Sequence, residues 1–213
     1  MSPGERGIGG AVPSAAEALL DFWFGRGRLS DAELAARQRL WFTADPAFDA
    51  ALRARFAPLV ADAAAGALDV WCASPRGRMA LILLLDQLPR NLFRGEARAF
   101  ATDPQALACT LAGIDAGHDR ALSPVERSFF YLPLQHAEDL AMQERCVAHC
   151  DALVREAPPA QRASLEEALV YAARHRDLIA RFGRFPHRNR VLGRAPTAAE
   201  ERYLAGGGER FGQ

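Results

Sequence analysis

Helix-start signals recur along this chain and constrain its fold more than any other feature of the sequence. Four boxes of the form Ser/Thr-x-x-Glu let a hydroxyl and a glutamate pair with backbone amides in a first helical turn: Ser14 with Glu17, Ser30 with Glu33, Ser123 with Glu126, and Thr197 with Glu200. Proline follows a capping residue, as it often does at the start of helices, at Asp45-Pro46, Ser74-Pro75, Asp103-Pro104 and Ser123-Pro124. Strand signals are nearly absent, because no long alternating run is bounded by hairpin turns. The sequence therefore predicts an all-α protein.

Apolar residues recur with a helical period and indicate about eight helices. The clearest stripe, with steps of three or four residues, is formed by Phe48, Leu52, Phe56, Leu59 and Ala63. The predicted helices cover residues 14–26, 30–41, 46–65, 75–88, 104–116, 124–155, 160–182 and 197–205. Pro133 lies inside the 124–155 stretch, so we expect a kink or a break there.

Short connections between successive helices favour antiparallel neighbours. We therefore expect antiparallel helical hairpins in one domain over residues 14–205, similar to tetratricopeptide-repeat (TPR) or α-solenoid folds. The sequence shows no convincing 34-residue repeat, so any repeat character is structural only. Residues 1–13 and 206–213 are expected to be flexible tails.

Composition excludes several classes of partner. The 26 basic residues are all arginine and equal the 26 acidic residues, so the net charge is zero. A neutral chain gains little from releasing counterions, which argues against nucleic acid as a partner. No apolar stretch approaches the roughly 20 residues that span a bilayer, and the N-terminus lacks the apolar run of a signal peptide. Four cysteines are too few for a disulfide framework. These features predict a cytoplasmic protein without membrane contact.

The first of three polar clusters, residues 85–95, follows a helix that is apolar on nearly all sides. Asp86 lies one turn beyond Ile82, so its carboxylate is expected to be buried. A buried carboxylate is unfavourable unless it is paired and hydrogen-bonded. Arg90 lies four residues later, with Asn91 beside it. These residues form either a structural ion pair that closes the helix or a carboxylate held for a substrate or a metal.

The second cluster, residues 126–139, places a histidine among apolar residues. His136 shares a helical stripe with Phe129 and Leu132, and it comes just after Pro133. A histidine in such a place can be a hydrogen-bonded core residue. The alternative is a functional histidine, because a proline break frees backbone carbonyls and opens space for a ligand.

The third cluster, residues 175–194, leaves a helix that Gly183 and Pro186 bring to an end. Its polar residues after the helix include Arg184, His187, Arg188, Asn189 and Arg190. Phe182 and Phe185 lie between these residues, and burial of the two rings would draw the arginines inward. The arginines either neutralise the carboxylates of the other clusters or bind an anion or a nucleotide.

The sequence predicts no metal and no cofactor. The paired Glu-x-x-His motifs of di-iron bundles are absent. Cys146, His149 and Cys150 lie on adjacent helical turns, but no second ligand pair of that type follows. No Gly-x-Ser-x-Gly elbow or cysteine signature of covalent catalysis occurs either. Whether the protein is an enzyme is left open.

Four segments closely resemble a bacterial family known as domain of unknown function 924: LLLDQLPRNLFRG, AFATDPQAL, ERSFFYLPLQHAEDLAMQ and HRDLIARFGRFPHRNRVLGR. The resemblance extends from about Leu19 through Leu204. It implies an all-helical fold similar to TPR proteins, and it brings no established activity. The matching positions include Asp86, Gln87, Arg90, Asn91, His136, Glu138, Asp139, Arg184, His187, Arg188 and Asn189. Leu88 and the Leu134-Gln135 pair depart from the expected residues only at packing positions.

Three functions are compatible with these observations. In the first, the clusters converge on a pocket that binds, and can transform, a small acidic or phosphorylated molecule. The catalytic candidates are then His136, His187 and Asp86, and the ligand-binding candidates are Arg90, Asn91, Arg184, Arg188, Asn189 and Asp139. In the second, a TPR-like groove binds a peptide or a partner protein. In the third, the arginine-rich segment 181–194 binds RNA. The residue types favour the pocket, and the oligomeric state is left open.

Overall fold

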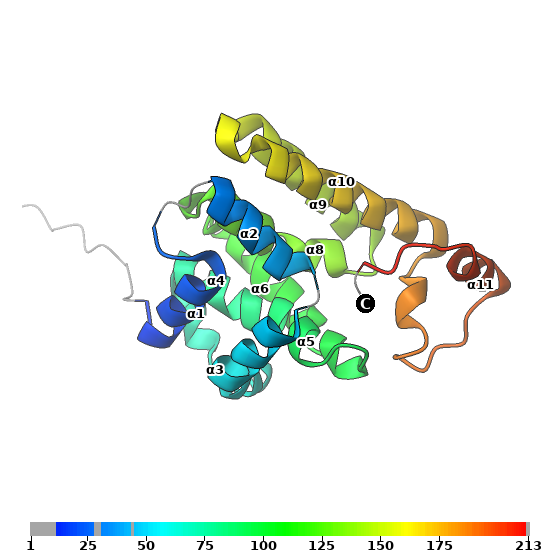
Figure 1. Cartoon of the computed structure of the whole chain (residues 1–213), viewed down its shortest axis with the longest axis horizontal. Helices are drawn as coiled ribbons and strands as arrows, with labels where there is room; N and C mark the ends of the chain where they lie inside the picture. The colour runs from blue at the N-terminus through cyan, green and yellow to red at the C-terminus, as the bar shows by residue number, and fades with distance from the viewer. Residues whose placement is uncertain (1–11, 28–30, 44, 212–213) are drawn as a thin grey trace, which may run out of the picture.

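The computed structural model describes residues 12–27, 31–43 and 45–211. Every regular element in these ranges is a helix (Figure 1), so the all-α prediction is confirmed. Ser30 of the predicted box and residues 1–11 of the predicted tail lie outside the described residues. The predicted TPR-like arrangement of the helices stays a prediction.

The elements follow one another in a simple order. The longer helices are α1 (Ser14–Phe24), α2 (Asp31–Phe42), α3 (Pro46–Ala64), α4 (Pro75–Leu85), α6 (Asp103–Asp115), α9 (Leu140–Glu156) and α10 (Pro159–Phe182). The shorter α-helices are α5 (Gln87–Leu92), α7 (Pro124–Phe130), α8 (Leu132–His136) and α11 (Ala198–Ala205). Short 3-10 helices lie between them: η1 (Asp69–Ala73), η2 (Ala97–Phe100), η3 (Asp119–Ala121) and η4 (Pro186–Arg188).

Helix α4 forms the centre of the hydrophobic core. Residues 79–85 of this helix are at most 3% exposed, as expected for a helix that is apolar on all sides. Helices α1, α3, α6 and α7 pack around it. The bulkiest fully buried side chains of this core include Trp23, Phe130 and Tyr131.

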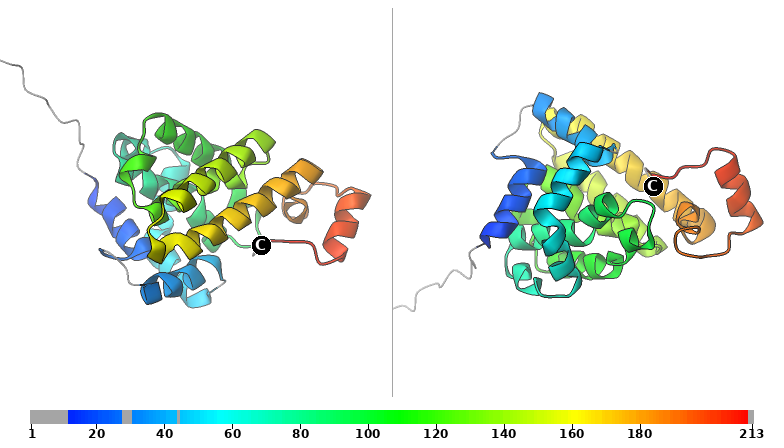
Figure 2. Two further views of the ribbon diagram at one scale, coloured as in Figure 1. Left: turned by 90° about the horizontal axis from the view of Figure 1, so that it is seen from above. Right: turned by 60° about the horizontal axis from the view of Figure 1, so that its bottom comes forward.

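Helices α9 and α10 form a hairpin along one side of the molecule (Figures 1 and 2). Only Ala157 and Pro158 separate the two helices, so they run antiparallel. Helix α2 meets α10 where Gln38 donates a hydrogen bond to Ser164 at 2.5 Å. Both views of Figure 2 show α11 at one end of the molecule, with the last described segment returning toward α10. In that segment, the ring of Phe211 stacks on His175. The flexibility predicted for residues 206–213 stays a prediction.

Proline divides two of the predicted helices. The predicted 75–88 helix ends at Leu85, because Pro89 has no N–H to donate to the Leu85 carbonyl. The hydroxyl of Thr102 donates to that carbonyl instead, at 2.6 Å. The chain then resumes as α5. The expected break at Pro133 is confirmed, since the predicted 124–155 helix is divided into α7, α8 and α9.

Side chains of other helices satisfy carbonyls around the Pro133 break. Thr110 donates to the Phe130 carbonyl at 3.1 Å. The amide of Gln143 donates to the carbonyls of Gln135 and Ala137, at 2.5 and 2.7 Å. The break is therefore a fixed part of the fold, because its free backbone acceptors have buried partners.

Most of the predicted helix starts are confirmed. Ser123 and Thr197 each form a complete capping box with the glutamate three residues later. Asp45 accepts from two backbone amides of α3, and Ser74 accepts from the Gly77 amide of α4. These contacts satisfy amides that have no partner inside their helices.

Two predicted caps are wrong. Pro13, not Ser14, occupies the capping position of α1, and Glu17 of that predicted box pairs with Arg76 instead. Thr102 occupies the capping position of α6, so Asp103 is the first residue of that helix. The Asp103 carboxylate caps nothing, because two arginines from other segments engage it.

Candidate functional site

The carboxylate of Asp86 meets the imidazole of His136 where α4 and α8 end. Asp86 Oδ1 lies 2.7 Å from His136 Nδ1. The amide of Gln87 donates to Asp86 Oδ2 at 2.6 Å, and Arg90 Nη1 lies 3.2 Å from Asp86 Oδ1. Asp86 is fully buried, so these groups replace the water that its charge would otherwise need. The first and second polar clusters thus meet in one place.

Arg90 and Arg188 share the carboxylate of Asp103. Both terminal nitrogens of Arg90 donate to Asp103, at 2.8 and 2.9 Å. Arg188 Nη1 donates to Asp103 Oδ2 at 3.3 Å and to the His136 carbonyl at 3.2 Å. The ring of Phe100 lies 5.5 Å from the guanidinium of Arg90 and 4.6 Å from that of Arg188. Arg188 therefore connects the third cluster to the first two.

Burial and neighbouring charges determine the protonation states of Asp86, His136 and Arg188. Burial would raise the pKa of Asp86, but Arg90 and His136 together outweigh it and hold that pKa well below its usual range. Burial, with a contribution from Arg90, lowers the pKa of His136. Burial also lowers the pKa of Arg188 to about 10, so that side chain stays charged at neutral pH. The site then holds an ionised Asp86, a neutral His136 and a cationic Arg188.

Two more histidines lie beside this group. The ring of His175 is 6.2 Å from that of His136 and 3.6 Å from that of Phe211, measured between centroids. His187 packs against Phe185, and its Nδ1 atom is buried without a hydrogen-bond partner among the described residues. Burial lowers the pKa of His187 to about 3 and that of His175 well below its usual value. Both rings are therefore neutral at neutral pH.

These groups line one cavity of about 450 Å³. We call its charged part the polar end, lined by Gln87, Arg90, His136, His175, His187 and Arg188. We call the adjoining part the apolar middle, lined by Trp41, Phe129, Leu132, Ala168 and Tyr171. Beyond the apolar middle, the cavity reaches the contact of α2 with α10, where Gln38, Arg39, Ser164 and Glu167 also line it.

Five of the predicted site residues line the cavity, and a sixth, Asp86, contacts one of them. Four of them line the polar end: His136, His187, Arg90 and Arg188. Asp86 does not line the cavity and contacts the Nδ1 atom of His136. Asn91 also lines the cavity, but its amide donates to Asp49 at 2.7 Å. Three clusters far apart in the sequence thus come together around one space.

The other three predicted residues do not line the cavity. Arg184 forms a bidentate ion pair with Glu200, at 2.7 and 2.8 Å. Asn189 accepts from Arg194, and Asp139 caps α9 by accepting from a backbone amide. Each of these side chains holds local structure together.

Sequence reasoning did not assign Asp103 or His175 to the site. Asp103 precedes a proline and therefore matches the pattern of a helix cap. That pattern gives no indication of its ion pairs with Arg90 and Arg188. The one sequence feature that could have marked Asp103 as a site residue is its position in the segment AFATDPQAL, which resembles the family. His175 lies on an apolar stripe of α10, as a core histidine would, and only the packing of α10 beside α8 brings it near His136.

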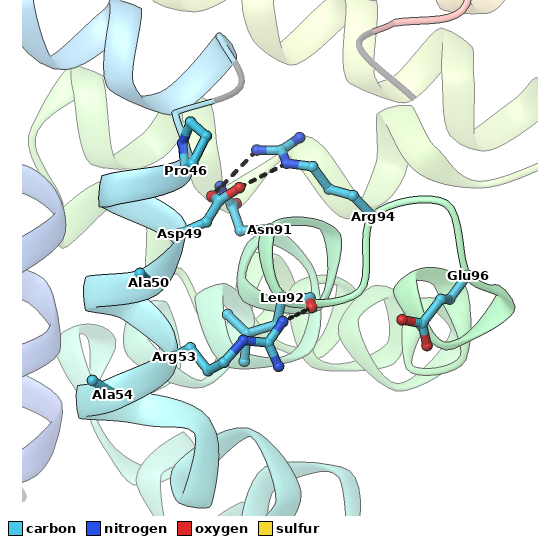
Figure 3. A pocket seen from close by; sticks show the side chains of 9 residues that line it. All are labelled: Pro46, Asp49, Ala50, Arg53, Ala54, Asn91, Leu92, Arg94 and Glu96. Carbon is cyan, nitrogen blue, oxygen red and sulfur yellow. Dashed lines mark hydrogen bonds and ion pairs between the residues drawn. The ribbon is translucent and has the colours of Figure 1, made fainter.

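A second hollow, of about 660 Å³, lies on the outside of α3 and α5 (Figure 3). Asp49 lies there between Asn91 and Arg94 and accepts from both side chains, at 2.7 and 2.9 Å. The guanidinium of Arg53 donates to the Leu92 carbonyl. These polar groups already pair with one another in an open surface depression, so we place the candidate site in the cavity of the three clusters.

Among residues 12–27, 31–43 and 45–211, no group of three or more His, Cys, Asp or Glu side chains is arranged to hold a metal ion. Within the same ranges, no helix has both the length and the apolar character needed to cross a membrane.

The chain is similar to proteins whose activity is not known. Residues 19–208 match a family described as bacterial protein of unknown function (DUF924). The solved structure of a protein of unknown function from Agrobacterium tumefaciens is 41% identical, with a TM-score of 0.73, and the match covers 89% of this chain and 96% of that chain. No curated protein matches. Because the family match spans most of the chain, this protein belongs to the DUF924 family.

Proposed function

We propose that the cavity binds a small acidic molecule, a carboxylate or a phosphate, at its polar end. One observation carries this proposal: Arg90 and Arg188 both reach the Asp103 carboxylate at the place where His136 lines the cavity. Planar guanidinium groups in a desolvated site are suited to bind carboxylate and phosphate oxygens.

Arg188 has a donor to offer to a ligand. Its side chain is 7% exposed, and its Nε atom has no hydrogen-bond partner among the described residues. A buried donor without a partner is unfavourable, so an acceptor supplied by a ligand would relieve that cost. Arg90 differs, because Asp103 and the Asp86 backbone already occupy both of its terminal nitrogens.

The Asp86–His136 pair is suited to move a proton on the bound molecule. Ionised Asp86 holds the proton of His136 on Nδ1. The Nε2 atom, which has no partner among the described residues, is then an acceptor for a proton. A buried imidazole oriented by a carboxylate can act as a general base when it is neutral and as a general acid once it is protonated. His136 therefore carries the catalytic part of the proposal, and Asp86 positions it.

The cavity favours a small molecule over a peptide or an RNA. A volume of about 450 Å³ is in the range of small-molecule sites. The contact of Gln38 with Ser164 and the stacking of Phe211 on His175 bound it at two places. The segment 181–194, the candidate for RNA binding, has Arg184 and Arg194 engaged with carboxylates of the same chain.

A thermal-shift screen tests this proposal. We also propose a cytoplasmic location, on the grounds of composition, so the appropriate ligands are small carboxylates and phosphate esters of the cytoplasm. We expect at least one anion to raise the Tm of the wild type by about 2 °C or more, with a much smaller effect on Arg188→Gln. Arg176→Gln is a matched control, because Arg176 does not line the cavity and pairs with the neighbouring Asp177. An anion that stabilises Arg188→Gln as much as wild type, or no stabilising anion at all, would contradict the proposal.

A further inference from the structure

The cavity changes from apolar to polar along its length. On α7 and α8, four of the lining residues follow one another in steps of three or four: Val125, Phe129, Leu132 and His136. Such steps place them on one helical face despite the break at Pro133. The first three are apolar and the last is a histidine. Ser128 and Gln135 line the cavity beside these four residues.

Helix α10 lines the opposite wall, which begins with the polar residues Ser164 and Glu167 and then also changes from apolar residues to a histidine. Ala168, Tyr171 and His175 follow one another on one face, in steps of three and four, after Ser164. The rings of His175 and His136 lie 6.2 Å apart, so both walls become polar at the same end. From Ser164 to His175, the wall extends about 16 Å at the usual rise of a helix. Trp41 of α2 adds to the apolar middle, with its ring 4.8 Å from that of Phe129.

A ligand that fits this cavity has one charged end and an apolar body. At the polar end, the Nε atom of Arg188 is a buried donor without a hydrogen-bond partner among the described residues. Arg39 and Arg94 also line the cavity, and Arg94 is already paired with Asp49. The apolar middle offers aromatic and aliphatic surface, which stabilises a ligand in proportion to the apolar area that it buries. A small polar anion such as a sugar phosphate would leave that surface without a partner.

The charged residues at the polar end favour a ligand with one negative charge over a ligand with two. Arg90 and Arg188 are balanced by Asp86 and Asp103, and His136 is neutral because it is buried and faces Arg90. A bound anion therefore adds uncompensated negative charge in a desolvated place, which is unfavourable. One proton taken up by a histidine offsets a monoanion completely, whereas a phosphate dianion would need two.

His136 is the histidine placed to take up that proton. The charged groups around it are Asp86 from the end of α4, Arg90 from α5, Asp103 from α6 and Arg188 from η4, and neutral His175 faces it from α10. Protonated His136 keeps its contact with Asp86, and that carboxylate stabilises the imidazolium. His175 and His187 have no carboxylate in contact with their rings among the described residues.

We propose that the ligand is a monocarboxylic acid with an apolar body, bound with its carboxylate at Arg188 and its body in the apolar middle, and that His136 takes up a proton as it binds. This inference rests on the proposed function and specifies its ligand class. In the binding step, no bond of the ligand is made or broken, and the proton comes from the solvent.

Calorimetric titration with five probes tests the inference: octanoate, acetate, octan-1-ol, octyl phosphate and inorganic phosphate. We expect octanoate to bind at least about tenfold more tightly than each of the others. Titrations in two buffers of different ionisation enthalpy at pH 7.5 should show that the protein takes up about one proton for each octanoate bound. His136→Gln should abolish that uptake while it leaves binding measurable.

Two cavity variants and a control test separately the contacts of the ligand's carboxylate and of its apolar body. Arg188→Gln should weaken octanoate about tenfold or more. Ala168→Phe fills the apolar middle, and it should weaken octanoate while the response to acetate stays the same. The control Arg176→Gln should change neither the binding of octanoate nor the response to acetate. Circular dichroism and the Tm of each variant show whether it is folded.

The outcomes distinguish this inference from the proposed function. If octan-1-ol equals octanoate, or if octanoate binds without proton uptake, the inference is wrong. If octyl phosphate or inorganic phosphate binds more tightly than octanoate and depends on Arg188, the inference is wrong but the proposed function holds. If no probe binds and no anion raises the Tm, both are wrong.

Discussion

Asp86 and His136 are fifty residues apart in the sequence, yet Asp86 Oδ1 lies 2.7 Å from His136 Nδ1. Asp86 ends α4, the central core helix, and His136 ends α8, the short helix after the Pro133 break. Two helix ends thus bring a carboxylate and an imidazole together inside the protein. Arg90 completes the group at 3.2 Å from the same carboxylate oxygen.

Loss of the Asp86 carboxylate should strongly destabilise the fold. Asp86→Ala leaves Arg90 as a buried cation with only one of its two carboxylates, and we expect a loss of about 3–5 kcal/mol in the free energy of unfolding. Urea unfolding measures it. Asp139→Ala is the matched control, since it removes a helix cap and should cost about 1 kcal/mol. Equal effects of the two substitutions would contradict the role given to Asp86.

Local signals predicted the parts of the fold that depend on neighbours in the sequence. The boxes of Ser123 and Thr197 and the break at Pro133 were predicted correctly, because their partners lie within a few residues. Asp103 and Asp139 show where such reasoning fails. Asp103 looked like a cap and instead engages Arg188, which lies 85 residues away, whereas Asp139 was a ligand candidate and is a cap.

The convergence of the three clusters was an inference from residue types, since spacing does not reveal which helix ends meet. Apolar surroundings around Asp86, His136 and Arg188 indicated that each group needs a buried partner. The partners themselves follow from the packing of α4, α8 and η4, which no local pattern encodes. His175 stayed hidden for the same reason, because its neighbour His136 lies on another helix.

Acidification should destabilise the protein through His187. Burial, with a contribution from Arg188, lowers the pKa of His187 from 6.5 to about 3. Between those pH values the unfolded chain binds a proton that the folded chain does not, so the free energy of unfolding falls as the pH falls through this window. The slope from His187 is at most about 1.4 kcal/mol per pH unit.

Urea unfolding at pH 6.5, 5.5 and 4.5 measures that slope. His187→Gln should show a shallower decline than wild type, because it removes one of the groups that take up a proton on unfolding. Identical slopes in the two proteins would show that His187 titrates normally in the fold.

The hydroxyl of Thr102 should stabilise the break between α4 and α5. It donates to the Leu85 carbonyl, which Pro89 leaves without a backbone donor. Thr102→Val removes that donor from a buried acceptor, and we expect a loss of about 1–3 kcal/mol. Pro89→Ala supplies an N–H, so Thr102→Val should cost less in that background. Additive effects in the double-mutant cycle would refute this explanation.

Cys72 should be the most reactive of the four cysteines. The contact of its Sγ with that of Cys109, at 3.6 Å, lowers its pKa to about 7, and the side chain is half-buried. The contact with Cys150 and burial raise the pKa of Cys146 well above its usual value. Brief alkylation with iodoacetamide at pH 7.5, followed by mass spectrometry, should label Cys72 first. Faster labelling of Cys146 or Cys109 would contradict the expectation.

Nuclear magnetic resonance of the His136 ring nitrogens tests the central claim most directly. In the free protein at pH 7.5, we predict a neutral imidazole with its proton on Nδ1, facing Asp86. Saturating octanoate or octyl phosphate, added separately, should shift the His136 resonances. His149 does not line the cavity and stacks on Tyr131, so its resonances should stay unchanged. A proton on Nε2 in the free protein, or an unchanged His136 with both ligands, would contradict the claim that Asp86, His136 and Arg188 form an anion-binding site.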